Sequence, residues 1–211
     1  MLLLVSTPIV YTAFIYASLP ATIPTHFDIN GKPNGFGSKD TIWFITVLLS
    51  VIALGLYLLM TNLAKIDPKK TAGQTPELYQ QLAIVLVGFL TAVNLVIVYS
   101  TQGGSIQVTK FLLPLLGLFF MALGFYMPRV KPNYFVGFRL PWTLENEENW
   151  MLTHRLVGKL WVPGGLFIFL MSLFLPSPYN FILFLLTTLV ITIIPVIFSY
   201  RHFKKNRSAN Q

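Results

Sequence analysis

Six stretches without a charged side chain constrain this sequence more than any other feature. Each is 16 to 23 residues long and continuously apolar, and a helix needs about 20 such residues to cross a bilayer. Continuous rather than alternating apolar runs also exclude a transmembrane barrel. The sequence therefore predicts an all-α integral membrane protein with six transmembrane helices. The runs are 2–19, 41–63, 82–99, 111–127, 160–175 and 179–200.

The few charged residues lie between these runs and predict an orientation. Only 10% of the chain is charged, against about 25% in a soluble domain. Lys and Arg collect on the cytoplasmic side of membrane proteins. Here twelve fall on one side of the predicted spans, namely Lys65, Lys69, Lys70, Arg129, Lys131, Arg139, Arg155, Lys159, Arg201, Lys204, Lys205 and Arg207. The other side holds three, Lys32, Lys39 and Lys110.

This asymmetry places both termini and the long loop 128–160 in the cytoplasm, and the loop 20–40 on the outer side of the membrane. It also accounts for the net charge of +8, so we expect contact with membrane lipid and no direct binding of nucleic acid. The first run has no basic segment before it, which favours a retained helix over a cleaved signal peptide.

The interiors of the predicted spans contain no Asp, Glu, Lys, Arg or His. Proton relays and ion coupling need such groups at membrane depth, so the pattern argues against a pump or a proton-driven transporter. Asn94 is the one amide in the middle of a span, and we expect it to make an interhelical hydrogen bond. The chain has no cysteine, which excludes disulfides and thiolate chemistry.

The loop 20–40 is rich in residues that form turns. Asn-Gly pairs at 30–31 and 34–35 favour tight turns because both residue types accept positive φ, so we expect a compact hairpin-like cap. His26 and Asp28 could form half of a metal site, but no third ligand accompanies them. We favour a hydrogen-bonded or solvated histidine and predict no metal or cofactor. The candidate binding residues are Pro24, His26, Phe27, Asp28, Gly31 and Lys39.

The loop 128–160 combines a planar cation, a rigid bend and an indole at its centre. Arg139 could pair with a carboxylate or stack on a ring, and Trp142 is expected at the depth of the lipid headgroups. Thr143 is a suitable N-cap for a following helix. That helix should be amphipathic, lie on the cytoplasmic surface and run into the fifth span. Its apolar face would carry Trp150, His154, Val157 and Trp161, and its opposite side Asn149, Arg155 and Lys159.

Three interpretations of this loop are open. Catalysis by Glu147, Glu148 and His154 has little support, because the sequence contains neither HExxH nor GxSxG. Structural anchoring at the membrane is a second interpretation. We favour a docking surface for a partner, since exposed Trp and Arg are common binding anchors, and we predict that the protein is not an enzyme. The candidate residues are Asn133, Gly137, Arg139, Pro141, Trp142, Thr143, Glu147, Trp150, His154 and Arg155.

The run from 133 to 162 resembles the signature region of the SdpI family, bacterial membrane proteins named after a toxin-immunity protein. The pattern N-x-x-x-G-x-R-x-P-W-T-L-x-x-x-x-x-W-x-x-x-x-R is matched by Asn133, Gly137, Arg139, Pro141, Trp142, Thr143, Leu144, Trp150 and Arg155. The loop 20–40 resembles an uncharacterised membrane domain often found at the start of these proteins. The resemblance implies a two-helix unit at 1–65 and an SdpI-like four-helix region at 80–211.

The resemblance also implies a function. The founding member of the family protects its cell from a secreted peptide toxin and holds a small DNA-binding repressor at the membrane once toxin is bound. By this analogy, the chain would be a non-catalytic sensor and immunity protein, with a peptide toxin as its partner outside and a repressor as its partner inside. The alternative is a transporter that exports a peptide or lipid.

Overall fold

The computed structural model of the chain describes residues 1–66, 75–102 and 108–209, apart from the side chains of 64, 208 and 209. Lys69 and Lys70, counted above for orientation, lie outside the described residues. The elements are α1 (Leu2–Ile15), η1 (Tyr16–Ser18), β1 (Thr22–Phe27), β2 (Pro33–Ser38), α2 (Thr41–Thr61), α3 (Leu63–Ile66), α5 (Pro76–Ser100), α6 (Thr109–Tyr126), η2 (Met127–Arg129), α7 (Pro141–Leu144), α8 (Glu147–Phe174) and α9 (Tyr179–Ala209).

Each apolar run of the sequence forms a helix. Five helices, α2, α5, α6, α8 and α9, are long and apolar enough to cross a membrane, whereas the apolar segment Leu2–Ser18 at the start is shorter. The predicted class, a helical multi-pass membrane protein, is therefore confirmed. The sixth crossing stays a prediction.

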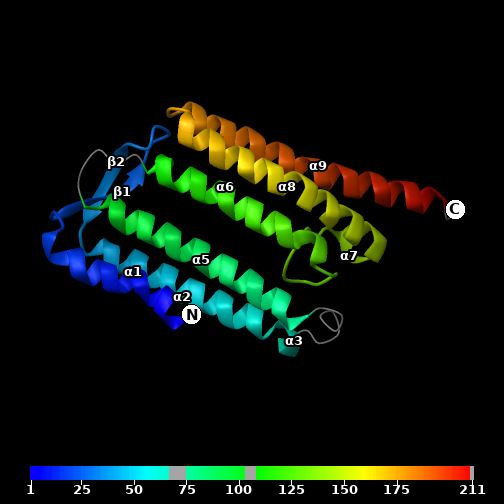
Figure 1. Cartoon of the computed structure of the whole chain (residues 1–211), viewed down its shortest axis with the longest axis horizontal. Helices are drawn as coiled ribbons and strands as arrows, with labels where there is room; N and C mark the ends of the chain where they lie inside the picture. The colour runs from blue at the N-terminus through cyan, green and yellow to red at the C-terminus, as the bar shows by residue number, and fades with distance from the viewer. Residues whose placement is uncertain (67–74, 103–107, 210–211) are drawn as a thin grey trace.

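The helices lie side by side in one elongated bundle (Figure 1). Helices α1, α2 and α5 pack together on one side, and α6, α8 and α9 pack together on the other. The contact between α5 and α6 joins the two groups. Most of α5 belongs to the predicted region 80–211, but this helix packs mainly against α2 and α1 of the predicted region 1–65. The division of the chain into these two regions stays a prediction.

A small polar cluster lies inside the first group of helices. The side-chain amide of Asn94 donates to the carbonyl oxygen of Thr46 at 3.0 Å and to the hydroxyl of Ser50 at 3.4 Å. The hydroxyls of Thr12 and Thr46 lie 3.3 Å apart. These bonds join α1, α2 and α5, and the predicted interhelical hydrogen bond of Asn94 is confirmed. Such a bond contributes about 0.6 to 2 kcal/mol within a membrane.

Glycines allow α6 and α8 to approach closely in the second group. A Cβ added at Gly117 would lie 2.7 Å from the carbonyl oxygen of Gly165, and one added at Gly158 would lie 2.9 Å from that of Gly124. The two glycines of each helix are seven residues apart, so they mark the same face of the helix two turns apart. The backbones therefore meet at two points, as small residues permit in membrane helices.

An antiparallel hairpin of β1 and β2 covers one end of the bundle (Figure 1). The hairpin-like cap predicted from the Asn-Gly turns is therefore present. Ile23 of β1 is fully buried in an apolar cluster with Ile15, Ile42 and Val98, which fixes the hairpin to the helices below it. We call this end of the molecule the hairpin end.

Candidate functional site in the loop 128–160

The signature loop, residues 128–160, lies at the opposite end of the bundle from the hairpin. Its first turn is organised by Asn133, whose side chain is 1% exposed. The side-chain oxygen accepts the N–H groups of Phe135 and Val136 at 2.8 and 2.7 Å. The amide nitrogen donates to the carbonyl oxygens of Lys131 and Val136 at 2.8 and 3.2 Å. One asparagine therefore replaces the regular backbone bonds that this segment lacks.

Gly137 brings the loop against α8. Its φ is +114°, which L side chains rarely adopt, and an added Cβ would lie 2.3 Å from Nε2 of His154. The N–H of Phe138 donates to this nitrogen at 2.9 Å, and Nδ1 lies 2.8 Å from the carbonyl oxygen of Trp150. Since Nε2 accepts a bond, the neutral ring carries its proton on Nδ1 and donates to that carbonyl. His154 thus joins the loop to α8 from a fully buried position.

The side chain of Thr143 caps the start of the short helix α7. Its hydroxyl accepts the N–H of Leu140 at 3.0 Å and lies 2.6 Å from the carbonyl oxygen of Phe138, to which it donates. The prediction that Thr143 caps the long helix is wrong. Asn146 is the N-cap of α8, and its side chain accepts the N–H of Asn149 at 2.8 Å. Thr143 is held inside α7, so the helix that it precedes begins three residues later than expected.

Two tryptophans attach the loop to its neighbours. The indole N–H of Trp150 donates to the carbonyl oxygen of Val130 at 2.7 Å, and the ring stacks on His154 with centroids 4.1 Å apart. The indole N–H of Trp142 donates to the hydroxyl of Ser199 on α9 at 2.9 Å. Trp150 is fully buried, so its role here is internal.

The position of Asn149 corrects the predicted helical faces. It was assigned to the polar side of the helix with Arg155 and Lys159, but it is fully buried. Its amide donates to the carbonyl oxygen of Ser199 at 3.0 Å, and its oxygen accepts the hydroxyl of Thr153 at 3.2 Å. The start of α8 is enclosed by the loop on one side and by α9 on the other, so two of its faces are buried. As predicted, this helix runs into the fifth span, since α8 is one continuous helix from Glu147 to Phe174.

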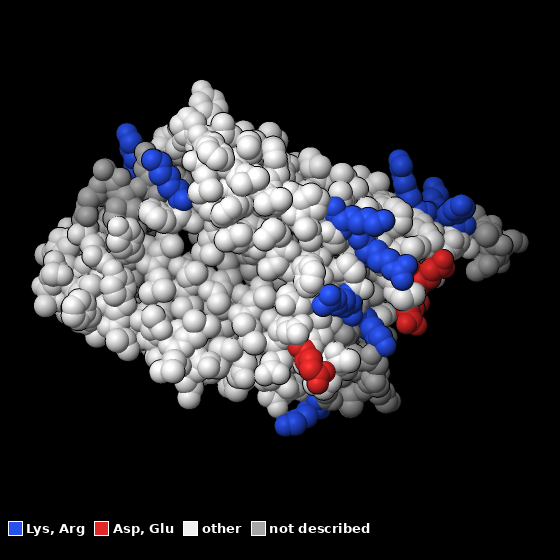
Figure 2. Space-filling view, in the orientation of Figure 1, with Lys and Arg blue, Asp and Glu red and all other residues white. Residues whose placement is uncertain are grey.

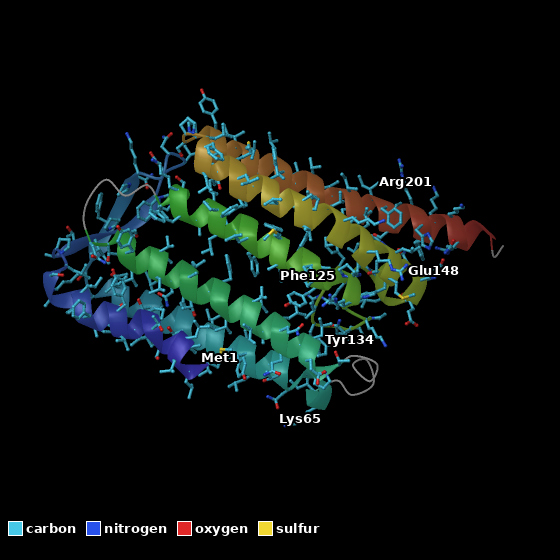
Figure 3. All side chains as sticks on the ribbon, viewed as in Figure 1. Met1, Lys65, Phe125, Tyr134, Glu148 and Arg201 are labelled. Atoms are coloured by element: carbon cyan, nitrogen blue, oxygen red, sulfur yellow. The ribbon has the colours of Figure 1, made fainter. Side chains whose placement is uncertain are left out.

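The exposed members of the predicted set lie on the outside of this scaffold. Arg139 is exposed, and its guanidinium donates to the carbonyl oxygen of Tyr134 at 2.6 Å. Glu147 and Arg155 are also exposed. Figure 3 labels Tyr134 and Glu148 at this end of the molecule. The structure thus separates the candidates into buried residues that shape the loop, Asn133, Thr143, Trp150 and His154, and exposed residues open to contact, Arg139, Pro141, Glu147 and Arg155. Contact with a partner stays a prediction.

An apolar cavity of about 230 Å³ lies beneath the loop. Phe135, Val136 and Phe138 of the loop form one wall, and Met60 and Trp161 come from α2 and α8. The cavity is therefore bounded by both groups of helices. Its lining residues carry no charged side chain, so the cavity favours an apolar group.

Glu147, Glu148 and His154, the residues considered for catalysis, do not form an open site in this loop. Both ring nitrogens of His154 are engaged with the backbone, and the ring is buried, whereas Glu147 and Glu148 are exposed. Among residues 1–66, 75–102 and 108–209, no three His, Asp or Glu side chains come together in a way that could hold a metal ion.

The hairpin residues have simpler surroundings. Nδ1 of His26 bonds the side-chain oxygen of Asn34, and the carboxylate of Asp28 accepts the N–H groups of Asn30 and Lys32, both at 2.9 Å. The bond from Lys32 is the main cause that holds the pKa of Asp28 below its ordinary value. His26 and Asp28 therefore serve separate turn contacts.

The remaining hairpin candidates lie along the strands and at their ends. Pro24 pairs with Phe36, and Phe27 pairs with Pro33 across the ladder. Gly31 has a φ of +73° at the turn. The ammonium group of Lys39 lies 4.7 Å from the centre of the Tyr16 ring.

Asn149, Ser199 and Val130 are the participants that the sequence did not reveal. The position of Asn149 next to Trp150 in the sequence is only weak evidence that its side chain takes part in the site. Ser199 lies 50 residues away in a run of ordinary apolar character, and Val130 contributes only its carbonyl group.

Comparison with known proteins agrees with the signature residues. Residues 129–199 match the SdpI/YfhL protein family, and residues 3–50 match a domain of unknown function, DUF1648. The immunity protein SdpI of Bacillus subtilis (strain 168) is 27% identical over 192 residues, which cover 90% of this chain and 88% of that protein. An uncharacterised protein of Archaeoglobus fulgidus is 38% identical over 53 residues, covering 25% of this chain and 28% of that protein.

No solved structure matches the chain. The resemblance inferred from the signature residues is nevertheless confirmed by the family match and the relative. The chain is a multi-pass membrane protein with a region that matches the SdpI/YfhL protein family behind a region that matches DUF1648.

Proposed function

We propose that this chain is a non-catalytic immunity protein of SdpI type in a bacterial cytoplasmic membrane. The observation that carries the proposal is the similarity to the Bacillus subtilis immunity protein over 90% of the chain. That similarity includes both ends of the bundle, so the hairpin end and the signature loop are both available to the shared function.

The proposed topology has six spans with both termini in the cytoplasm. Figure 2 shows Lys and Arg gathered in a band near the signature loop and the C-terminal tail, with a long uncharged surface between this band and the hairpin end. Positive charge favours the cytoplasmic side. A cysteine placed at Asn34 should react with an impermeant maleimide in intact cells, and one placed at Glu147 should react only after lysis. The reverse pattern would contradict the topology.

At the outer end, the hairpin is the proposed contact for a peptide toxin. The side chain of Phe36 is 64% exposed and that of Ile29 47% exposed, and Lys32 and Lys39 add positive charge close by. Exposed apolar side chains beside cations suit an amphipathic peptide that arrives from outside.

At the inner end, the exposed side of the signature loop is the proposed docking surface for a cytoplasmic partner such as a small repressor. Buried Asn133 and His154 fix the loop from below, and the exposed Arg139 side chain is held on this support by its bond to the carbonyl oxygen of Tyr134. A rigid anchor loses little conformational entropy on binding. In this proposal Arg139 contacts the partner, and the buried residues position it.

Recruitment tests the inner contact. A fluorescent repressor fusion should move to the membrane when toxin is added to cells with the wild-type chain. The variant Arg139→Ala should reduce this movement, whereas Arg201→Ala, a matched loss of charge on α9, should not. Equal recruitment by the wild type and Arg139→Ala would remove Arg139 from the docking surface.

A further inference from the structure

A groove on the outer surface of α6 and α8 is separate from the cavity beneath the signature loop. It has a volume of about 340 Å³ and is lined by Gly124, Phe125, Pro128, Arg155, Gly158, Lys159 and Val162. Its floor includes backbone, because a Cβ added at Gly158 would lie 2.9 Å from the carbonyl oxygen of Gly124. Phe125 forms an open wall and is 55% exposed.

The charge of this groove is of one sign. Arg155 and Lys159 are four residues apart on α8, so both project from the same helical face, and both are exposed. None of the seven lining residues is acidic. The guanidinium of Arg129 lies 4.7 Å from the centre of the Phe125 ring, which adds a third positive charge at the edge. The groove thus joins an apolar floor to a cationic rim.

We propose that this groove binds one anionic phospholipid, with the phosphate at Arg155 and Lys159 and an acyl chain along Gly124, Phe125 and Val162. The guanidinium can bond two phosphate oxygens, and the ammonium adds a point charge. Basic pockets between membrane helices on the cytoplasmic side are suited to anionic headgroups. An acyl chain accounts for the apolar floor, which a free phosphate would not use.

Native mass spectrometry of the full chain in detergent tests the proposal, with phosphatidylglycerol and phosphatidylcholine as probes. The wild type should retain phosphatidylglycerol more tightly. The variant Arg155→Gln/Lys159→Gln should bind it about 25-fold more weakly, since each cation near the surface is worth about a factor of five. The control Lys65→Gln/Arg207→Gln removes the same charge at the same end of the molecule, outside the groove, and should bind like the wild type.

Two further variants separate the groove from general charge attraction. Val162→Trp fills the apolar part without changing charge and should also weaken phosphatidylglycerol binding, while Arg155→Lys should retain most of it. Equal binding of the two lipids, an equal loss in the control, or displacement of phosphatidylglycerol by millimolar inorganic phosphate would each overturn the proposal.

Discussion

At the signature-loop end, buried side chains hold an irregular backbone in place, whereas at the hairpin end two strands hold one another through backbone bonds. Asn133, His154 and Trp150 together bond the backbone of the loop and its neighbours from the interior. In the hairpin, β1 pairs with β2, and Ile23 alone is fully buried along the strands. One end therefore depends on individual residues, and the other mainly on strand pairing and turns.

This difference helps to explain why the residues of the signature pattern have two kinds of role in this chain. Asn133, Gly137 and Trp150 belong to the pattern and shape the interior of the loop. Arg139 and Arg155 belong to the same pattern and are exposed. The signature thus combines a scaffold with a surface. Substitutions should separate the two, because scaffold residues will change stability and surface residues will change binding.

The largest effect is expected for Gly137→Ala. The strained φ costs about 1 to 3 kcal/mol, and the clash with His154 adds about 1 to 3 kcal/mol, so the free energy of unfolding should fall by about 2 to 6 kcal/mol. Unfolding by SDS in mixed micelles would measure it. Gly31→Ala in the hairpin should lower the free energy of unfolding by less. The added Cβ would lie 2.7 Å from the hydroxyl of Thr109, a longer approach than the 2.3 Å to His154 at Gly137. Gly55→Ala, inside α2 with open space around it, is the control and should raise the free energy of unfolding by about 0.5 to 1 kcal/mol.

Asn133→Ala should have the next largest effect. It leaves the partly buried N–H groups of Phe135 and Val136 without their acceptor, and each such group costs about 1 to 2 kcal/mol, the lower part of the range for buried groups. The same unfolding assay should show a loss of about 2 to 4 kcal/mol, whereas Asn34→Ala in the exposed hairpin should cost less than about 1 kcal/mol. Equal losses at the two positions would contradict the comparison between the ends.

Trp150→Phe should have an intermediate effect of about 2 kcal/mol, because the carbonyl oxygen of Val130 loses its indole donor in a buried site. Protection of the Phe138 amide against hydrogen exchange should also fall, since the smaller phenyl ring gives His154 less surface on which to stack. Trp43→Phe, next to the hairpin end, should leave that amide unchanged. A loss of protection in both variants would show that the loop is not locally supported.

The smallest effect is expected from Asp28. Its pKa is lowered in the folded hairpin, mainly by the N–H of Lys32, so the carboxylate favours the folded turn above the ordinary pKa of about 3.9. This contribution is lost as the pH falls through the folded pKa. The protection factor of the Lys32 amide against hydrogen exchange should therefore fall at low pH in the wild type and show no such step in Asp28→Asn. A pH step of the same size in both would exclude Asp28 as its source.

Much of the fold follows from local patterns in the sequence. Apolar runs predict the helices, and the two Asn-Gly pairs predict the hairpin. The surroundings of α8 are different, because they depend on distant residues. A helical repeat places Asn149 about 100° around the helix from Trp150 but does not show that Ser199 of α9 covers that side. The N-cap of α8 is Asn146 and not the predicted Thr143 for a similar reason. The Thr143 hydroxyl accepts the N–H of Leu140 at the start of α7.

The most direct test of the account is the membrane potential of cells challenged with the peptide toxin that the family resemblance implies, followed with a voltage-sensitive dye. Cells with the wild-type chain and with Arg139→Ala should keep their potential, while a deletion strain should depolarise. That result would place protection in the hairpin end and the spans, and recruitment in the signature loop. Equal depolarisation of the wild type and the deletion strain would contradict the immunity function itself.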